Sequence, residues 1–307
     1  MKKCVLIINP NSGKNLDEDY IFDFQKILQK YDYETVIYFT ARGKHATSII
    51  SKLEDDTDLV ISVGGDGTFN EIVNGNLKRK HKLLLAHIPV GTTNDIGAMF
   101  GYGPDILENL KMVLDGTVKE IDICTINKKA FVYVAGFGKF MNVPYETPRN
   151  LKSKYGHLAY VIEAIKNFVS PTELYDITYK IDDKVYSGEY SFMLISNANR
   201  IAGINNFYKE VKLDDGKFEV LLCNLTKKAD IVKALGMIAT SNVSSAKGFE
   251  FFRLDELELK FKNTPKNAWC IDGEKLDDDT KTYKIEMVKN FAILMPKKNV
   301  KKLFVNK

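Results

Sequence analysis

Cysteine and histidine are both scarce in this 307-residue sequence, which has four of each. Cys4, Cys124, Cys223 and Cys270 lie far apart, no two of them have the Cys-x-x-Cys spacing, and the histidines do not cluster with them. A disulfide framework needs paired cysteines, and a zinc site needs closely spaced Cys and His ligands. The distribution argues against both and is typical of a protein in a reducing cytoplasm.

Long apolar runs are missing as well. No segment approaches the ~20 consecutive apolar residues with which a helix crosses a bilayer. The first residues, Met1–Cys4, are followed by the short apolar run Val5–Ile8 and then directly by a turn, which is too short for a signal peptide. We therefore expect a soluble cytoplasmic protein.

Charge of one sign is not in large excess. The 44 Lys and Arg residues exceed the 40 Asp and Glu residues by only +4, which does not indicate nucleic-acid binding. An apolar content of 45% argues against disorder. At roughly 100–200 residues per domain, the length predicts two domains that each bury a core.

Short apolar runs alternate with helical patterns over the first 125 residues. Val5–Ile8, Leu59–Val63 and Leu83–Val90 predict buried strands, whereas Phe69–Leu77 and Ile106–Leu114 have the spacing of helices. This alternation predicts an α/β domain with a doubly wound, Rossmann-like parallel sheet. Ligands of such sheets bind at the carboxyl ends of the strands.

The pattern changes after about residue 125. Ile177–Ile181 and Val185–Asn197 flank the turn residues Asp182-Asp183-Lys184, which predicts a hairpin. In Phe251–Phe261 the apolar residues recur with the period of two that is typical of strands. We therefore expect residues 126–287 to form an antiparallel, all-β sandwich.

Three turns in the first domain combine glycine with hydroxyl, amide and carboxyl side chains. They are Asn9–Lys14, Gly64–Glu71 and Pro89–Asp95, and each follows a predicted strand. Glycine lets the backbone approach a ligand closely, and N–H groups at strand-to-helix turns bind phosphate well. None of the three is a Walker A loop or a Gly-x-Gly-x-x-Gly turn. Together they predict a phosphate or nucleotide site.

These turns resemble those of the diacylglycerol kinase catalytic domain, which sphingosine and ceramide kinases share. Three later segments also look like signatures of that family: Lys154–Tyr160, Leu213–Gly216 and Ile271–Glu274. The resemblance covers nearly the whole chain and is strongest to the compact bacterial enzymes. It implies transfer of the γ-phosphate of ATP to the hydroxyl of diacylglycerol, giving phosphatidic acid, with Mg²⁺ as cofactor.

The resemblance also implies an arrangement of domains. Residues 288–307 would return to complete the ATP-binding domain of residues 1–125, and residues 126–287 would bind the lipid. Nucleotide would lie in the cleft between the two domains. The residues that would hold ATP are Asn9, Pro10, Asn11, Ser12, Gly13, Thr40, Gly65, Asp66, Gly67, Thr68, Phe69, Asn70, Glu71 and Thr92.

Catalytic roles are likewise implied by the resemblance. Asp66 would engage the catalytic Mg²⁺, Asp95 would support it, and Glu274 would be the general base that takes the proton of the lipid hydroxyl. These residue types suit phosphoryl transfer, because Mg²⁺ prefers carboxylate and phosphate oxygens and a lipid hydroxyl needs a base. A second, structural Mg²⁺ would lie on Asp215 and on backbone carbonyls near Lys212 and Lys217.

The sequence departs from the family at two places. Members often carry an arginine soon after the Asn-Asp pair, and Ile96–Phe100 has none. Lys14 or Lys139 could take over phosphate binding if that arginine contributes to it. The Gly-Gly that usually precedes the Asp-Asp-Gly segment is Ala202-Gly203 here.

Other functions remain open at this point. NAD kinases share the Gly-Gly-Asp-Gly-Thr turn, although Asn70-Glu71 directly follows it here and lies much further along in those enzymes. Within the lipid kinases, the acceptor could be a sphingoid base, ceramide, phosphatidylglycerol or a prenol. A non-catalytic nucleotide or lipid sensor is disfavoured because Asp66, Asp95 and Glu274 are all present.

A kinase that acts on membrane lipid has to reach the bilayer, so we expect peripheral membrane association. Three basic clusters are candidates for contact with an anionic surface. They are Lys2-Lys3, Lys78–Lys82, and Lys297-Lys298 with Lys301-Lys302. The resemblance is also compatible with a homodimer.

Overall fold

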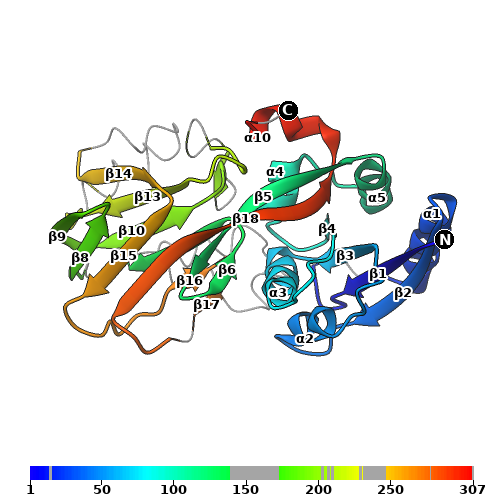
Figure 1. Ribbon diagram of the computed structural model, residues 1–307, viewed down its shortest axis with the longest axis horizontal. Coiled ribbons are helices and arrows are strands. Elements are labelled where there is room, and N and C mark those ends of the chain that lie inside the picture. The colour runs from blue at the N-terminus through cyan, green and yellow to red at the C-terminus, as the bar shows by residue number, and fades with distance from the viewer. Residues whose placement is uncertain are drawn as a thin grey trace. The chain divides into compact units, whose positions relative to one another are not determined.

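The computed structural model describes residues 1–13, 16–138, 173–201, 204–205, 208, 211–227, 230, 247–276 and 278–305. The chain forms two compact units, coloured from the N-terminus to the C-terminus in Figure 1. Unit 1 comprises Met1–Ile121 and Lys289–Lys307, and unit 2 comprises Asp122–Val288. Lys14, Lys139, Lys154–Tyr160 and Ala202-Gly203 lie outside the described residues.

A parallel sheet forms the centre of unit 1. Its strands lie in the order β2-β1-β3-β4-β18, and every neighbouring pair is parallel. All six residues of β3 are buried, as in parallel sheets that carry helices on both faces. The strands are β1 (Lys2–Ile8), β2 (Tyr33–Phe39), β3 (Leu59–Gly64), β4 (Leu85–Pro89) and the last part of β18 (Thr282–Met295).

The helices of unit 1 pack an apolar side against this sheet. Asp17 accepts a hydrogen bond from the Tyr20 N–H (3.1 Å) and begins α1, and Asp105 begins α5 in the same way. The helical elements are α1 (Glu18–Lys30), α2 (His45–Ser51), α3 (Asp66–Leu77), α4 (Asp95–Phe100), α5 (Ile106–Leu114), the 3₁₀ turn η2 (Lys297–Asn299) and α10 (Val300–Leu303). None of the helices in the described part of the chain is both long and apolar enough to cross a membrane.

Helix α3 begins at Asp66, whereas the sequence predicted a start at Phe69. Gly65 precedes it in an extended conformation (φ −85°, ψ 179°) and has no side chain with which to cap the helix. The Asp-Gly pair that looked like part of a turn is therefore the first turn of the helix. As a result, the carboxylate of Asp66 lies at the positive end of the helix dipole.

Unit 2 is a β-sandwich, which confirms the predicted fold class. One sheet has the strand order β14-β13-β10-β7-β16-β17, and the other contains β5, β6, β15, β8, β9 and the first part of β18. Side chains of both sheets share one core, in which the rings of Phe137 and Phe261 lie 4.7 Å apart. The remaining strands are β5 (Thr117–Ile126), β6 (Lys129–Phe131), β7 (Val134–Gly138), β8 (Tyr175–Ile181), β9 (Lys184–Tyr190), β10 (Phe192–Ser196), β11 (Arg200–Ile201), β12 (Ile204–Asn205), β13 (Phe218–Cys223), β14 (Phe249–Leu254), β15 (Glu256–Phe261), β16 (Cys270–Ile271) and β17 (Glu274–Lys275).

The predicted hairpin at residue 182 is present. Strands β8 and β9 pair antiparallel from Tyr175↔Tyr190 to Ile181↔Lys184. Asp182 has a positive φ of 52°, which Asp tolerates better than most residues. The polar turn in the sequence therefore marks the hairpin as expected.

Candidate active site

The three glycine-containing turns of unit 1 come together at the carboxyl ends of β1, β3 and β4. A Cβ atom on Gly91 would lie 2.6 Å from the Cα of Gly65, so the second and third turns touch through their backbones. A Cβ on Gly13 would lie 3.0 Å from the carbonyl oxygen of Val90. Glycine is required at Gly91 because no side chain fits between the loops.

Two asparagines brace these loops. The side-chain nitrogen of Asn9 donates to the Thr68 hydroxyl at 3.0 Å, which joins the first turn to α3. Asn94 has a left-handed backbone (φ 51°); its side chain accepts from the Gly91 N–H at 2.8 Å and donates to the Gly91 carbonyl at 2.7 Å. The loops are therefore held by their own polar side chains.

Two buried aspartates lie at this edge of the sheet, and the carboxylate of one contacts the backbone of the other. Asp66 is 8% exposed and Asp95 is 1% exposed. The Asp66 carboxylate accepts hydrogen bonds from the backbone N–H groups of Asp95 (2.9 Å) and Ile96 (3.2 Å), which are the first residues of α4. Asp66 thus links the beginnings of α3 and α4, where backbone N–H groups favour negative charge.

The remaining residues predicted to hold ATP lie in the first turn and at the start of α3. Asn9 organises the first turn by accepting from the Asn11 N–H (3.0 Å) through its side chain and from the Ser12 N–H (3.1 Å) through its carbonyl. The first turn of α3 has no side-chain cap, which leaves a position suited to phosphate. Pro10 lies in the turn after β1, and Gly67 and Asn70 lie in the first turns of α3.

Phe69 and Glu71 both have structural roles in this arrangement. Phe69 is fully buried and packs on the ring of His87, with centroids 4.8 Å apart. The Glu71 carboxylate accepts from the N–H groups of Lys44 (2.7 Å) and Ala46 (3.1 Å) and so caps the start of α2. Their assignment to ATP stays a prediction, and capping of α2 is a role that the sequence did not reveal.

Two threonines complete the predicted ATP set. Thr40 is 7% exposed at the end of β2, where its N–H donates to the Ile8 carbonyl at 2.8 Å. Thr92 is exposed in the turn that follows β4. Both therefore lie at the carboxyl ends of strands, as the sequence predicted for ligand-binding residues.

In unit 2, Glu274 stands on a tight hairpin. Strands β16 and β17 pair at Ile271↔Glu274, so the connecting loop consists of Asp272 and Gly273 alone. Both loop residues have positive φ (47° and 85°), which is the conformation of the type I′ turns that Asp-Gly favours. Glu274 itself is exposed.

Asp272 anchors this hairpin. Its carboxylate is 4% exposed and accepts from three successive backbone N–H groups, those of Val132 (2.6 Å), Tyr133 (3.1 Å) and Val134 (3.0 Å). Sequence reasoning did not single out Asp272, although an Asp-Gly pair between apolar residues is a known hairpin signal. The position of Glu274 therefore depends on a carboxylate two residues earlier.

The Leu213–Gly216 segment of unit 2 is built on charge pairs. The Asp215 carboxylate accepts from the Lys217 N–H (3.0 Å) and from the Arg253 guanidinium (2.6 Å). Lys217 pairs with Asp255 at 3.4 Å, and Lys212 is half-buried beside the turn. Both Asp215 oxygens therefore accept hydrogen bonds from protein donors, as both Asp66 oxygens do. The structural Mg²⁺ predicted here stays a prediction.

The residues predicted to hold the catalytic Mg²⁺ lie at the edge of the unit 1 sheet. Asp66 and Asp95 are both buried there, and Mg²⁺ is commonly held by one or two carboxylates together with substrate phosphates. Among the described residues, no group of three or more His, Cys, Asp or Glu side chains is placed to hold a metal ion. Phosphate oxygens would have to complete the shell.

Known proteins are similar to this chain in sequence and in fold. A model of the diacylglycerol kinase catalytic domain matches residues 3–126. A diacylglycerol kinase of Staphylococcus epidermidis is 35% identical over 240 residues, which cover 78% of this chain and 74% of that protein. One of Staphylococcus saprophyticus is 34% identical over 240 residues, covering 78% and 77%. The crystal structure of a diacylglycerol kinase from Bacillus anthracis strain Sterne matches with a TM-score of 0.77 at 24% identity, covering 97% and 99% of the two chains.

An α/β unit with glycine turns at its strand ends, followed by a β-sandwich, is the architecture of an ATP-dependent lipid kinase. This chain belongs to the diacylglycerol kinase family. The resemblance in the sequence is thereby confirmed, and family membership favours a lipid kinase over an NAD kinase.

Proposed function

We propose that this enzyme transfers the γ-phosphate of ATP to the free hydroxyl of diacylglycerol and releases phosphatidic acid and ADP. The convergence of the three glycine turns on the Asp66–Asp95 pair is the observation that carries this proposal. Diacylglycerol as the acceptor is supported by the relatives, which are named diacylglycerol kinases.

We assign unit 1 to ATP and unit 2 to the lipid. The turns around Gly65 and Gly91 bring backbone N–H groups and a helix N-terminus to one edge of the sheet, which suits the phosphates of ATP. Asp66 and Asp95 would hold Mg²⁺, which would neutralise charge on the β- and γ-phosphate oxygens.

Glu274 is assigned as the general base. In the reaction the lipid oxygen forms a bond to the γ-phosphorus, the bond from that phosphorus to the oxygen of ADP breaks, and the hydroxyl proton passes to the Glu274 carboxylate. The rigid Asp-Gly hairpin holds the carboxylate without relying on a flexible loop.

The test is phosphate transfer from labelled ATP to dioleoylglycerol in mixed micelles, with NAD offered in parallel. We expect Mg²⁺-dependent labelling of the lipid alone, and a fall of about 10²–10⁴-fold in kcat for Glu274→Gln. Glu258→Gln, an exposed glutamate on β15, is the matched control and should keep wild-type kcat. Labelling of another lipid in place of dioleoylglycerol would reject the acceptor, and an active Glu274→Gln variant would reject the base.

A further inference from the structure

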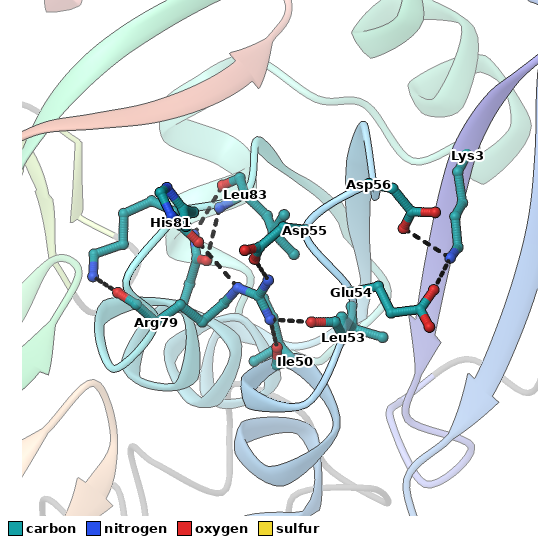
Figure 2. A network of polar contacts seen from close by, with 11 residues as sticks. Lys3, Ile50, Leu53, Glu54, Asp55, Asp56, Arg79, His81 and Leu83 are labelled. Atoms are coloured by element: carbon teal, nitrogen blue, oxygen red, sulfur yellow. Dashed lines mark hydrogen bonds and ion pairs between the residues drawn. The ribbon is translucent and has the colours of Figure 1, made fainter.

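The first of the three basic clusters of the sequence is engaged by acidic side chains. The Lys3 ammonium pairs with Glu54 and Asp56, both at 2.9 Å, and the Lys3 N–H donates to Asp58. Figure 2 shows Lys3 held between these carboxylates. Its charge is therefore compensated within unit 1.

The second cluster is also used inside the protein. The Arg79 side chain is 5% exposed and donates to the carbonyls of Ile50 (2.9 Å) and Leu53 (2.6 Å) while pairing with Asp55 (2.5 Å), as Figure 2 shows. Lys82 donates to the carbonyls of Leu77 (2.8 Å) and Arg79. Arg79 and Lys82 hold the α3–β4 connection together and are poorly available to an external surface, whereas Lys78 and Lys80 of this cluster are exposed.

The third cluster differs from both. Lys297, Lys298, Lys301 and Lys302 are exposed on η2 and α10. Lys297, Lys298 and Lys301 form no ion pair with any other residue that the structure describes. The next residues, Leu303 and Phe304, are buried at 1% and 2% exposure and fasten the segment to unit 1. The lysines are thus presented outward on a firmly packed segment.

Apolar side chains lie beside these lysines. The Lys119 ammonium lies 5.5 Å from the centre of the Phe304 ring, which brings the start of β5 against the C-terminal segment. Val118 and Val305, each next in sequence to one partner of that contact, are 51% and 54% exposed. Exposed aliphatic side chains within a group of lysines are the composition with which proteins bind the interface of an anionic bilayer.

The segment also lies close to the carboxylate pair of unit 1. The Asn299 side chain donates to the Met99 carbonyl at 2.8 Å, and Figure 1 shows α10 beside α4. Helix α4 begins with Asp95 and rises about 9 Å over its length. The Asn299 hydrogen bond therefore joins the lysine-bearing segment to the helix that begins with a proposed Mg²⁺ ligand.

We propose that unit 1 docks on an anionic lipid bilayer through one surface. This surface, here called the C-terminal basic surface, consists of Val118, Lys119 and residues 297–305. This docking rests on the proposed function, because a lipid acceptor lies in a membrane. Docking through this surface would bring the Asp66–Asp95 edge to the bilayer that contains the acceptor. The attraction would weaken with salt, because charges at a surface are screened.

The experiment is flotation of the full chain with two kinds of vesicle. One contains phosphatidylcholine alone, and the other also contains about 30% phosphatidylglycerol, which gives a negative surface potential. The test variant replaces Lys297, Lys298, Lys301 and Lys302 by Gln. The control removes the same charge from exposed lysines elsewhere in unit 1, namely Lys26, Lys30, Lys78 and Lys80. A second variant, Val118→Gln with Val305→Gln, tests the apolar part.

We expect the wild type and the control to bind the anionic vesicles, and the test variant to bind them at least about tenfold more weakly. Its thermal midpoint, its KM for ATP and its kcat on a water-soluble short-chain diacylglycerol should be unchanged. Equal vesicle binding by the test variant and the control would overturn the proposal. A raised KM for ATP with vesicle binding intact would also overturn it, because the lysines would then bind the nucleotide. Lysine-dependent binding without transfer to any diacylglycerol would instead reject the proposed function and leave the surface standing.

Discussion

At the scale of single residues, Asp272 shows how one carboxylate positions another. Its two oxygens accept from three successive backbone N–H groups, the last of which belongs to the first residue of β7, and its own N–H donates to the Val134 carbonyl at 2.9 Å. These bonds join the β16–β17 hairpin to β7. The position of Glu274 is therefore fixed by the buried residue Asp272, two positions earlier in the chain.

Removing this carboxylate should be costly. Asp272→Ala leaves two buried N–H groups and one part-buried N–H group without their acceptor, and each buried one costs about 1–3 kcal/mol, so we expect the free energy of unfolding to fall by about 3 kcal/mol or more. Asp272→Asn keeps one accepting oxygen and should lose less stability. Urea denaturation measures both.

The same variants separate positioning from folding. In the folded Asp272→Asn protein we expect kcat to fall at least tenfold while the KM for ATP stays constant, because the change lies in unit 2 and acts through Glu274. A loss of stability with unchanged kcat would show that Asp272 has a structural role only.

At the scale of elements, the close approach of two loops determines the shape of the nucleotide site. Gly91→Ala would place a methyl group 2.6 Å from the Gly65 Cα and 2.8 Å from the Asn94 side chain, neither of which can move without opening the turns. We expect the Kd for ATP to rise at least about tenfold, since misplacement by an ångström is costly in such sites. Isothermal titration calorimetry would measure it.

Gly103→Ala is the matched control for that prediction. An added Cβ at Gly103 meets no atom within 4 Å and the residue has no positive φ, so ATP binding should be unchanged. Wild-type affinity in Gly91→Ala would mean that the two loops separate easily, contrary to the packing described above.

At the scale of the whole molecule, one buried acid should make stability depend on pH. Glu219 on β13 is 2% exposed, and burial raises its pKa to about 8 even though Arg253 lies 3.3 Å away and lowers it. The folded protein therefore binds a proton that the unfolded chain releases above its ordinary pKa of 4.5. The stabilisation is complete below that value and is lost as the pH rises through about 8.

The prediction compares the wild type with Glu219→Gln, which does not titrate. Between pH 4.5 and 8.5 we expect the free energy of unfolding of the wild type to fall by about 3–5 kcal/mol relative to the variant. Urea denaturation at several pH values measures the difference. Parallel curves for the two proteins would show that Glu219 is ionised in the folded state throughout.

Some of this protein could be predicted from local patterns. Buried apolar runs such as Leu59–Val63 specify strands of a parallel sheet, and parallel strands necessarily bring the turns that follow them to one edge. For that reason the convergence of the glycine turns follows from the sequence. The Asp-Gly hairpin before Glu274 is equally local, because its turn type is encoded in two residues.

Tertiary structure alone decided which partner each polar side chain finds. Glu71 meets the start of α2, Asp215 meets Arg253 and Asp272 meets the amides before β7, at separations of 25 to 140 residues along the chain. Asn299 reaches Met99 from 200 residues away and sets the lysines of α10 beside α4. The period at which apolar residues recur in the sequence indicates only whether a side chain faces the core or the solvent. Its hydrogen-bond partner depends on which distant backbone the packed core brings within about 3 Å.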